Sequence, residues 1–302
     1  MVSGDNISIT DIPGVMVGHA QNAEAKTGCT VILTPDGAVG GVDIRGSAPG
    51  TREVEILKPV RLIRKVHGVL LTGGSAFGLD ATGGVQKFLE EKGIGYDTGV
   101  ARIPIVPTAV IFDLRVGDPS IRPDREMGYA ACLNASTSPP EEGLVGAGIG
   151  ASAGAISGFG QMGRGGLAIE ALKISDKVMV GVLVVVNPFG NVIDSEAGEV
   201  LVGTLDQSEW SYSPPNRLSE NTTLAMIVTN ARLTVEEAVK ISQMSQDGVA
   251  RAVIPSHTMF DGDISFCLST GDEKIDLNEL GNKAAELVTR AIVKAVRITN
   301  RI

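Results

Sequence analysis

Hydrophobic residues recur along this chain in two patterns, short unbroken apolar runs and runs with the spacing of a helix face. The unbroken runs predict strands that are buried on both faces, because such strands have no polar side to alternate with. These expected strands are residues 30–34, 69–72, 103–106, 178–186, 224–229 and 264–268.

The helical spacing predicts helices at residues 78–92, 124–133, 234–250 and 276–297. Thr234 is followed three residues later by Glu237, which forms a capping box at the start of the third helix. In the last helix the apolar residues from Leu277 to Ala295 fall on one face. That face indicates core packing rather than a cofactor site.

Strands and helices alternate over the whole length, and no linker divides the chain. We therefore expect a single α/β domain covering residues 1–302. Residues 211–221 are rich in Ser, Pro and Asn, which predicts an exposed, cleavable connection.

Composition narrows the classes of function. Apolar residues make up 43% of 302 residues, which indicates a globular chain. The net charge is −9 and basic residues do not cluster, which argues against nucleic-acid binding. No apolar segment approaches the roughly 18 residues of a membrane span, so we expect no membrane partner.

Cysteine and histidine usage points to a reduced compartment. The three cysteines lie far apart without metal-type spacing, and residues 1–20 lack the pattern of a secretion signal. We therefore expect a cytoplasmic protein with unpaired cysteines. Only three histidines occur, so we expect no metal centre, although His257 leaves a Ser-His-Asp hydrolase open.

Two glycine-rich segments invite a ligand interpretation. Gly73, Gly74 and Ser75 connect an expected strand to a helix, where backbone amides could cradle an anion or simply form a tight turn. The tract from Gly146 to Gly166 contains a partial dinucleotide fingerprint. The residues that follow it have a low helix propensity, whereas the fingerprint requires a helix there. Closely packed backbone is therefore a stronger interpretation than nucleotide binding.

The most informative feature is the junction between Asn221 and Thr222. A polar run ends at Asn221, and Thr222 opens an apolar strand. Cleavage of this bond would give Thr222 a free α-amine beside its hydroxyl, and such an amine can activate a Thr nucleophile. An ordinary loop-to-strand junction is the alternative.

Three further polar residues could assist such a nucleophile. Asn187 ends an expected strand, where its amide could stabilise an oxyanion or form an Asn-Pro turn. Asp261 and Asp263 precede the strand at 264–268. They could bind an amine, relay a proton or flank a nucleophile, or they could belong to an Asp-Gly turn.

Taken together, the segments resemble the DmpA-type family of L-aminopeptidases/D-esterases and β-aminopeptidases. The resemblance covers about 260 residues, and its specificity comes from the order of the pieces. They are residues 9–15, 28–31, 41–46, 73–80 (Gly-Gly-Ser-Ala-Phe-Gly-Leu-Asp), 187–190 (Asn-Pro-Phe-Gly), 221–224 (Asn-Thr-Thr-Leu) and the segment through Asp263.

The resemblance implies a four-layer αββα sandwich and a precursor that cleaves itself into an α chain of residues 1–221 and a β chain of residues 222–302. It implies Thr222 as nucleophile and Asn187 as oxyanion donor. The family's Ser-Gly-Glu element aligns with Asp261-Gly262-Asp263. Here Thr replaces the more usual Ser nucleophile, and Asp261 replaces the Ser of that element.

The substrate site implied by the resemblance includes Gly73, Gly74, Ser75 and Phe112, the last near a family Tyr. We expect hydrolysis of small peptides, amino-acid amides or esters without a cofactor or metal, by a homo-oligomer of processed units. An acyltransferase like the ornithine acetyltransferases is one alternative. A non-catalytic nucleotide-binding or small-molecule-binding protein is the other.

Overall fold

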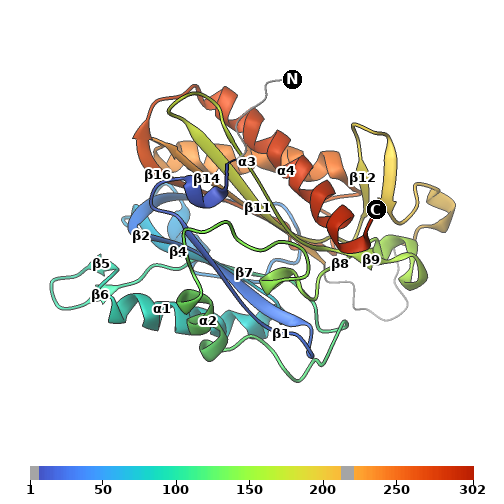
Figure 1. Ribbon diagram of the computed structural model, residues 1–302, viewed down its shortest axis with the longest axis horizontal. Coiled ribbons are helices and arrows are strands. Elements are labelled where there is room, and N and C mark those ends of the chain that lie inside the picture. The colour runs from blue at the N-terminus through green and yellow to red at the C-terminus, as the bar shows by residue number, and fades with distance from the viewer. Residues whose placement is uncertain (1–6, 212–220) are drawn as a thin grey trace.

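A computed structural model describes residues 7–211 and 221–302 of the chain (Figure 1). Over these residues, nine strands form one mixed sheet in the order β10-β11-β14-β16-β2-β4-β7-β3, with β1 paired to β2. The strands are β1 (Met16–Asn22), β2 (Thr27–Ile44), β3 (Thr51–Arg52), β4 (Lys65–Thr72), β7 (Thr108–Val110), β10 (Gly166–Lys173), β11 (Met179–Asn187), β14 (Thr222–Ala231) and β16 (Ile264–Glu273).

Two short strand pairs, a three-stranded sheet, four α-helices and several 3₁₀ turns complete the described fold. The remaining strands are β5 (Tyr96–Asp97), β6 (Arg102–Ile103), β8 (Ser152–Ala153), β9 (Gly163–Arg164), β12 (Asn191–Asp194), β13 (Glu199–Val202) and β15 (Val253–Ile254). The α-helices are α1 (Thr82–Glu91), α2 (Arg125–Leu133), α3 (Val235–Ala252) and α4 (Leu277–Asn300).

The long strand β2 divides the sheet into two halves. Its first part pairs with β1 and β4, and its last part pairs with β16. The two halves therefore form separate layers, with α3 and α4 outside one and α1 and α2 outside the other (Figure 1). The αββα sandwich predicted from the sequence is confirmed.

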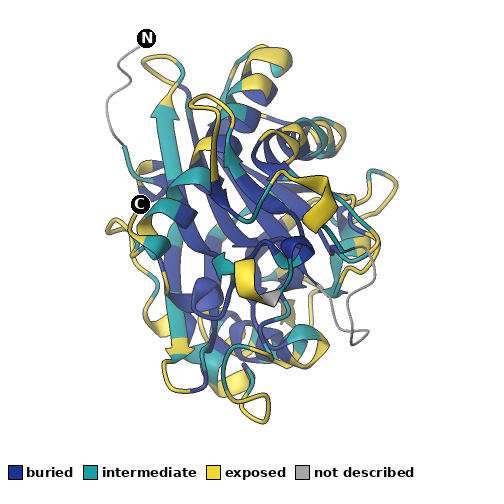
Figure 2. Cartoon of the chain, turned by 90° about the vertical axis from the view of Figure 1, so that its right-hand side faces the viewer, coloured by how far each residue is buried: buried dark blue, intermediate teal, exposed yellow. Residues whose placement is uncertain are grey.

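Alternation along the buried strands assigns side chains to these layers. In β14, Leu224 and Met226 belong to the core between the two strand layers, whereas Ala225 and Ile227 face α3 and α4. A third core lies under α1 and α2 and includes Val31 of β2. Figure 2 shows the buried strands in dark blue running through the molecule, with exposed residues at loops and outer helix faces.

Most of the predicted elements are present. Helix α3 begins after its predicted cap, with Thr234 and Glu237 forming the capping box, and α4 begins one residue after its predicted start, with Asp276 as N-cap. The strand predicted at residues 103–106 is wrong beyond Ile103, because β6 ends there. The next backbone amides bond to side chains instead of a strand, with Ile105 donating to His67 Nδ1 and Val106 to Glu53.

The glycine tract contains close-packed turns and short strands. Residues 146–166 form 3₁₀ turns, β8 and β9, and the described backbone there holds no α-helix that could complete a dinucleotide fingerprint. A Cβ on Gly165 would lie 1.8 Å from the carbonyl oxygen of Val186, and one on Gly150 would lie 2.2 Å from that of Lys26. These glycines allow backbones to approach closely.

Candidate active site

Strand β14 places Thr222 at the meeting point of three strands. It lies between antiparallel β11 and parallel β16. Thr222 pairs directly with Asn187 of β11, and Asn221 forms a parallel bridge with Asp261. Strand register therefore gathers residues that are far apart in the sequence.

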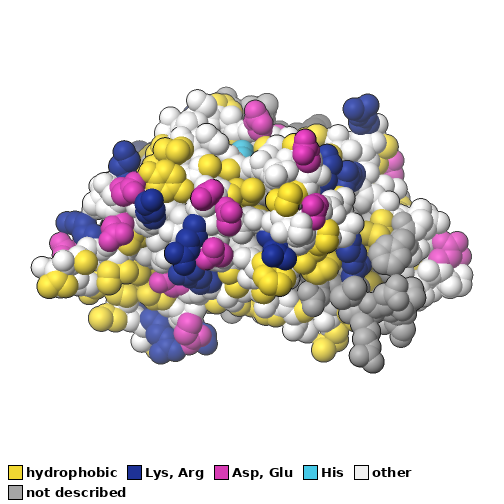
Figure 3. Space-filling view, turned by 90° about the horizontal axis from the view of Figure 1, so that it is seen from below, with side chains coloured by type: hydrophobic (Ala, Val, Ile, Leu, Met, Phe, Trp, Pro, Cys, Tyr) yellow, Lys and Arg dark blue, Asp and Glu magenta, His cyan; other side chains and the backbone are white. Residues whose placement is uncertain are grey.

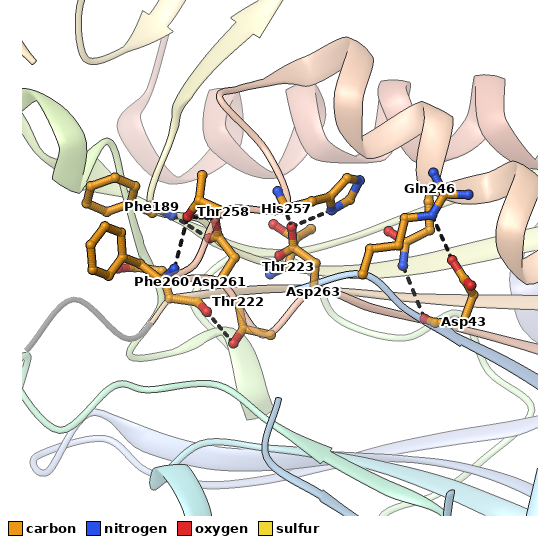
Figure 4. A network of polar contacts seen from close by, with 12 residues as sticks. Asp43, Phe189, Thr222, Thr223, Gln246, His257, Thr258, Phe260, Asp261 and Asp263 are labelled. Atoms are coloured by element: carbon orange, nitrogen blue, oxygen red, sulfur yellow. Dashed lines mark hydrogen bonds and ion pairs between the residues drawn. The ribbon is translucent and has the colours of Figure 1, made fainter. Parts of the chain in front are cut away.

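The Thr222 hydroxyl lies against the carbonyl of the residue before it (Figure 4). Its Oγ1 donates to the Asn221 carbonyl oxygen at 2.5 Å, and the Gly262 backbone N–H donates to the same oxygen at 2.7 Å. Two donors on one carbonyl oxygen polarise the carbonyl group. Gly262 also leaves room for the hydroxyl, because a Cβ there would lie 2.8 Å from Thr222 Oγ1.

Asp263 connects the start of β14 to the loop before β16. One carboxylate oxygen accepts from the Thr223 N–H at 2.6 Å. The other accepts from the His257 N–H at 3.1 Å and lies 2.8 Å from His257 Nδ1. Asp263 is buried, and both of its carboxyl oxygens have hydrogen-bond partners.

Asp261 lies two residues away and is fully buried. Its carboxyl group accepts from the Phe189 N–H at 3.0 Å and from the Thr258 N–H and hydroxyl at 3.0 and 2.6 Å. Burial, followed by the charge of nearby Asp263, raises the pKa of Asp261 to about 6. A buried carboxyl group with a raised pKa beside a second carboxyl group is typical of acid–base sites.

The side chain of Asn187 is buried and its orientation is fixed. Its Oδ1 accepts from the Ser152 N–H at 2.9 Å, and its Nδ2 donates to the Phe112 carbonyl at 3.2 Å. An amide nitrogen carries two hydrogens, so one N–H remains after the bond to Phe112.

A cavity of about 280 Å³ opens beside Thr222. Its lining residues are Ala48, Pro49, Gly50, Ser75, Ala76, Val110, Phe112 and Thr222. Two of the predicted substrate residues, Ser75 and Phe112, thus lie beside the proposed nucleophile. Ser75 is also one of few non-glycine residues with a left-handed backbone, at φ 52°.

Gly73 and Gly74 lie outside the lining of this cavity and make a different contact. The Gly74 N–H donates to the Asp113 carboxylate at 2.7 Å, and the Thr27 hydroxyl donates to it at 2.7 Å. Burial raises the pKa of Asp113, and these two hydrogen bonds counteract part of that rise. The anion that the glycine turn holds is therefore a side chain of the protein itself.

The sequence interpretation named Gly262 and His257 but did not find the contacts that they make here. The role of Gly262 is a backbone N–H, which no side-chain pattern reveals. His257 contacts Asp263 because residues 257–263 form a turn, in which the Thr258 hydroxyl donates to Asp261. In the sequence, the only signal for this turn was the spacing of Thr258 and Asp261. Within residues 7–211 and 221–302, no three His, Cys, Asp or Glu side chains are grouped to hold a metal ion.

A four-layer αββα fold with a hydroxyl residue opening a central strand places the chain in the class of hydrolases with an N-terminal nucleophile-type fold. Residues 7–302 match the model of Peptidase family S58, and the chain belongs to this family. The structure of the L-aminopeptidase D-Ala-esterase/amidase from Ochrobactrum anthropi superposes with a TM-score of 0.72 at 16% identity. The match covers 98% of this chain and 88% of that chain.

Curated relatives are more similar in sequence. An uncharacterized aminopeptidase of Mycobacterium tuberculosis is 38% identical, over 96% of this chain and 93% of the relative. A 6-aminohexanoate-oligomer endohydrolase of Kocuria sp. is 31% identical, over 95% of this chain and 85% of the relative. Family membership supports a hydrolase that acts on peptide or amide bonds.

None of the helices in the described ranges has the length and apolar character needed to cross a membrane.

Proposed function

We propose that this chain is a self-processing aminopeptidase or amidase-esterase with Thr222 as its nucleophile. The observation that supports it most strongly is the contact of the Thr222 hydroxyl with the Asn221 carbonyl, which Gly262 also polarises. A nucleophile and an activated electrophile are adjacent across the bond that must break.

In the processing step, Thr222 Oγ1 attacks the Asn221 carbonyl carbon and the peptide C–N bond breaks. The hydroxyl proton passes to the departing nitrogen, and an ester links Asn221 to the Thr222 side chain. Water then hydrolyses this ester, which leaves a carboxylate on Asn221 and restores the hydroxyl. The products are an α chain of residues 1–221 and a β chain of residues 222–302, which stay together as one domain.

In turnover, the freed α-amine of Thr222 acts as the base. The reference pKa of an α-amine is about 7.7–8.0, which suits proton transfer near neutral pH. Thr222 attacks the substrate carbonyl, and the remaining N–H of Asn187 stabilises the oxyanion. The leaving amine or alcohol takes the proton from the α-amine, and water releases the acyl group.

Asp261 and Asp263 position these groups rather than bind the substrate amine. Each carboxyl group already accepts three hydrogen bonds from the protein, including those from Phe189 and Thr223. Asp261 can in addition hold or release a proton near pH 6, because its pKa is raised to about that value.

The lining of the cavity beside Thr222 favours substrates with small, uncharged acyl groups. Among the described residues, it contains Val110, Phe112 and Ser75 and no charged side chain. The names of the relatives support peptides and amide oligomers as substrates. We further propose that the protein is located in the cytoplasm and that the processed units form a homo-oligomer. The three buried, unpaired cysteines are consistent with a cytoplasmic location.

Hydrolysis assays test the proposal. Purified protein is incubated with L-, D- and β-amino-acid amides, the matching esters and 6-aminohexanoate oligomers, and Thr222→Ala and Thr222→Ser serve as paired variants. The proposal predicts turnover by the wild type and Thr222→Ser, and none by Thr222→Ala. Equal turnover by Thr222→Ala would contradict it. Predominant acyl transfer to an added amine acceptor would instead identify an acyltransferase.

A further inference from the structure

His257 lies behind the nucleophile, in the loop that carries both carboxylates. Its side chain is 17% exposed, and both its N–H and its Nδ1 face the same oxygen of Asp263. Figure 4 shows the imidazole on one side of Asp263 and Thr223 on the other. No described residue forms a hydrogen bond with His257 Nε2.

The Asp263 carboxylate therefore joins His257 to the start of β14. Its second oxygen accepts from the Thr223 N–H at 2.6 Å, and Thr223 directly follows the nucleophile. A carboxylate can only accept hydrogen bonds, so the ring nitrogen that contacts it must carry a proton. The contact fixes a hydrogen on Nδ1 and orients the carboxylate.

We propose that His257 is a positioning residue for Thr222, acting through an Nδ1–H donor to Asp263. Removal of this donor would leave that oxygen of Asp263 with only the backbone N–H of residue 257, so the carboxylate would hold the Thr223 N–H, and with it the nucleophile, less firmly. Misplacement by about 1 Å can lower a rate on the order of 100-fold. This inference rests on the proposed function, because it assigns a role within the same reaction.

The backbone conformation of His257 guides the choice of variants. Its φ is 55°, in the left-handed region that non-glycine residues rarely occupy. Asn and Gly tolerate this conformation best. Asn also places an amide nitrogen where His has Nδ1, whereas Gly offers no side-chain donor.

These properties give a matched pair of variants. His257→Asn keeps the donor and His257→Gly removes it, while both accept the left-handed backbone. We expect His257→Asn to process and turn over within about threefold of the wild type. We expect His257→Gly to lose about 10- to 100-fold in processing rate and kcat, with KM within about twofold.

His67→Asn is the control. His67 is a buried histidine of β4 that accepts from the Ile105 N–H and makes no contact with the carboxylates. We expect it to lower the melting temperature and leave kcat unchanged. If His257→Gly does not fold, His257→Ala replaces it, because Ala also removes the side-chain donor and adds no charge beside Asp263.

Intact mass and steady-state kinetics of these variants decide between outcomes. Equal rates for the Asn variant and the donor-free variant, whether both normal or both impaired, would overturn the role of His257. The proposed function would stand in that case, provided that the wild type is processed. A wild type that remains one chain and hydrolyses nothing would overturn both.

Discussion

Thr222 and Asn187 lie directly opposite each other on the antiparallel strands β14 and β11. The pairing brings a hydroxyl and a carboxamide together at the ends of two buried strands, beside a cavity of about 280 Å³ lined by Thr222 and Phe112. Asn187 is held there by Ser152 and by the Phe112 carbonyl. A fixed donor next to a nucleophile stabilises an oxyanion without reorganisation during the reaction.

Asn187→Ala should therefore reduce kcat on the order of 100- to 1,000-fold, with a much smaller change in KM. The reason is that the lost hydrogen bond is strongest in the transition state. Steady-state kinetics on an amide substrate measure the effect.

Asn191→Ala is the matched control for that variant. Asn191 is also a buried amide with both ends bonded, to Ser157 and Thr204, but it pairs with Ile254 rather than with Thr222. It should lose stability and keep kcat. A similar kcat for the two alanine variants would reject the role of Asn187.

Gly262→Ala should slow self-processing by at least about tenfold. The added Cβ would lie 2.8 Å from Thr222 Oγ1 and 2.7 Å from the Ala48 carbonyl oxygen, so the hydroxyl or the backbone must move. A time course of intact mass after synthesis follows the reaction. Gly160→Ala is the control, because a Cβ there meets no atom within 4 Å. Processing of Gly262→Ala at the control rate would contradict the geometry.

Asp261 should make the folded state less stable as the pH rises. Its pKa is about 6 in the folded chain and about 3.8 when unperturbed, so the native state binds more protons between these values. The free energy of unfolding, relative to Asp261→Asn, should fall by about 2 kcal/mol between about pH 4 and pH 7.

Denaturant unfolding of both proteins across this pH range measures the difference. Thr222→Ala is used as the background, so that processing does not alter the chain. A pH-independent difference, or one that grows with pH, would show that Asp261 is not held in this way.

Phe112→Ala should widen the substrate range. Phe112 lines the cavity, and the Arg115 guanidinium lies 5.2 Å from its ring centre. Truncation should raise kcat/KM for bulky acyl groups relative to small ones by about tenfold, as expected for a hydrophobic pocket. Phe77→Ala is the control, since Phe77 also lies beside an arginine, Arg122, and is 61% exposed. An unchanged preference in Phe112→Ala would exclude Phe112 from the acyl pocket.

Charged side chains of both signs lie on the surface of the described residues. In the view from below, basic and acidic side chains are interspersed and the basic ones form no continuous stripe (Figure 3). Nucleic-acid surfaces depend on clustered basic residues.

Local patterns predicted the elements that depend on local sequence. The apolar run after Thr222 became β14, and Thr234 with Glu237 capped α3 as expected. These features involve residues within a few positions of each other, so periodicity and capping rules apply directly. The Asn221–Thr222 junction was recognisable for the same reason.

Features that depend on distant partners could not be read in this way. Strand β10 contains Glu170, Ala171 and Leu172, which suit a helix as well as a strand, and its pairing with β11 decides the outcome. The contact of Gly74 with Asp113 spans 39 residues. The approach of Asp263 to Thr223 depends on the parallel pairing of β14 with β16.

Intact-mass analysis of the purified wild-type protein tests the central claim most directly. The account predicts two fragments, residues 1–221 and 222–302, and a single uncut chain for Thr222→Ala. A wild-type protein that hydrolyses its substrates at full rate while remaining one chain of 302 residues would contradict it.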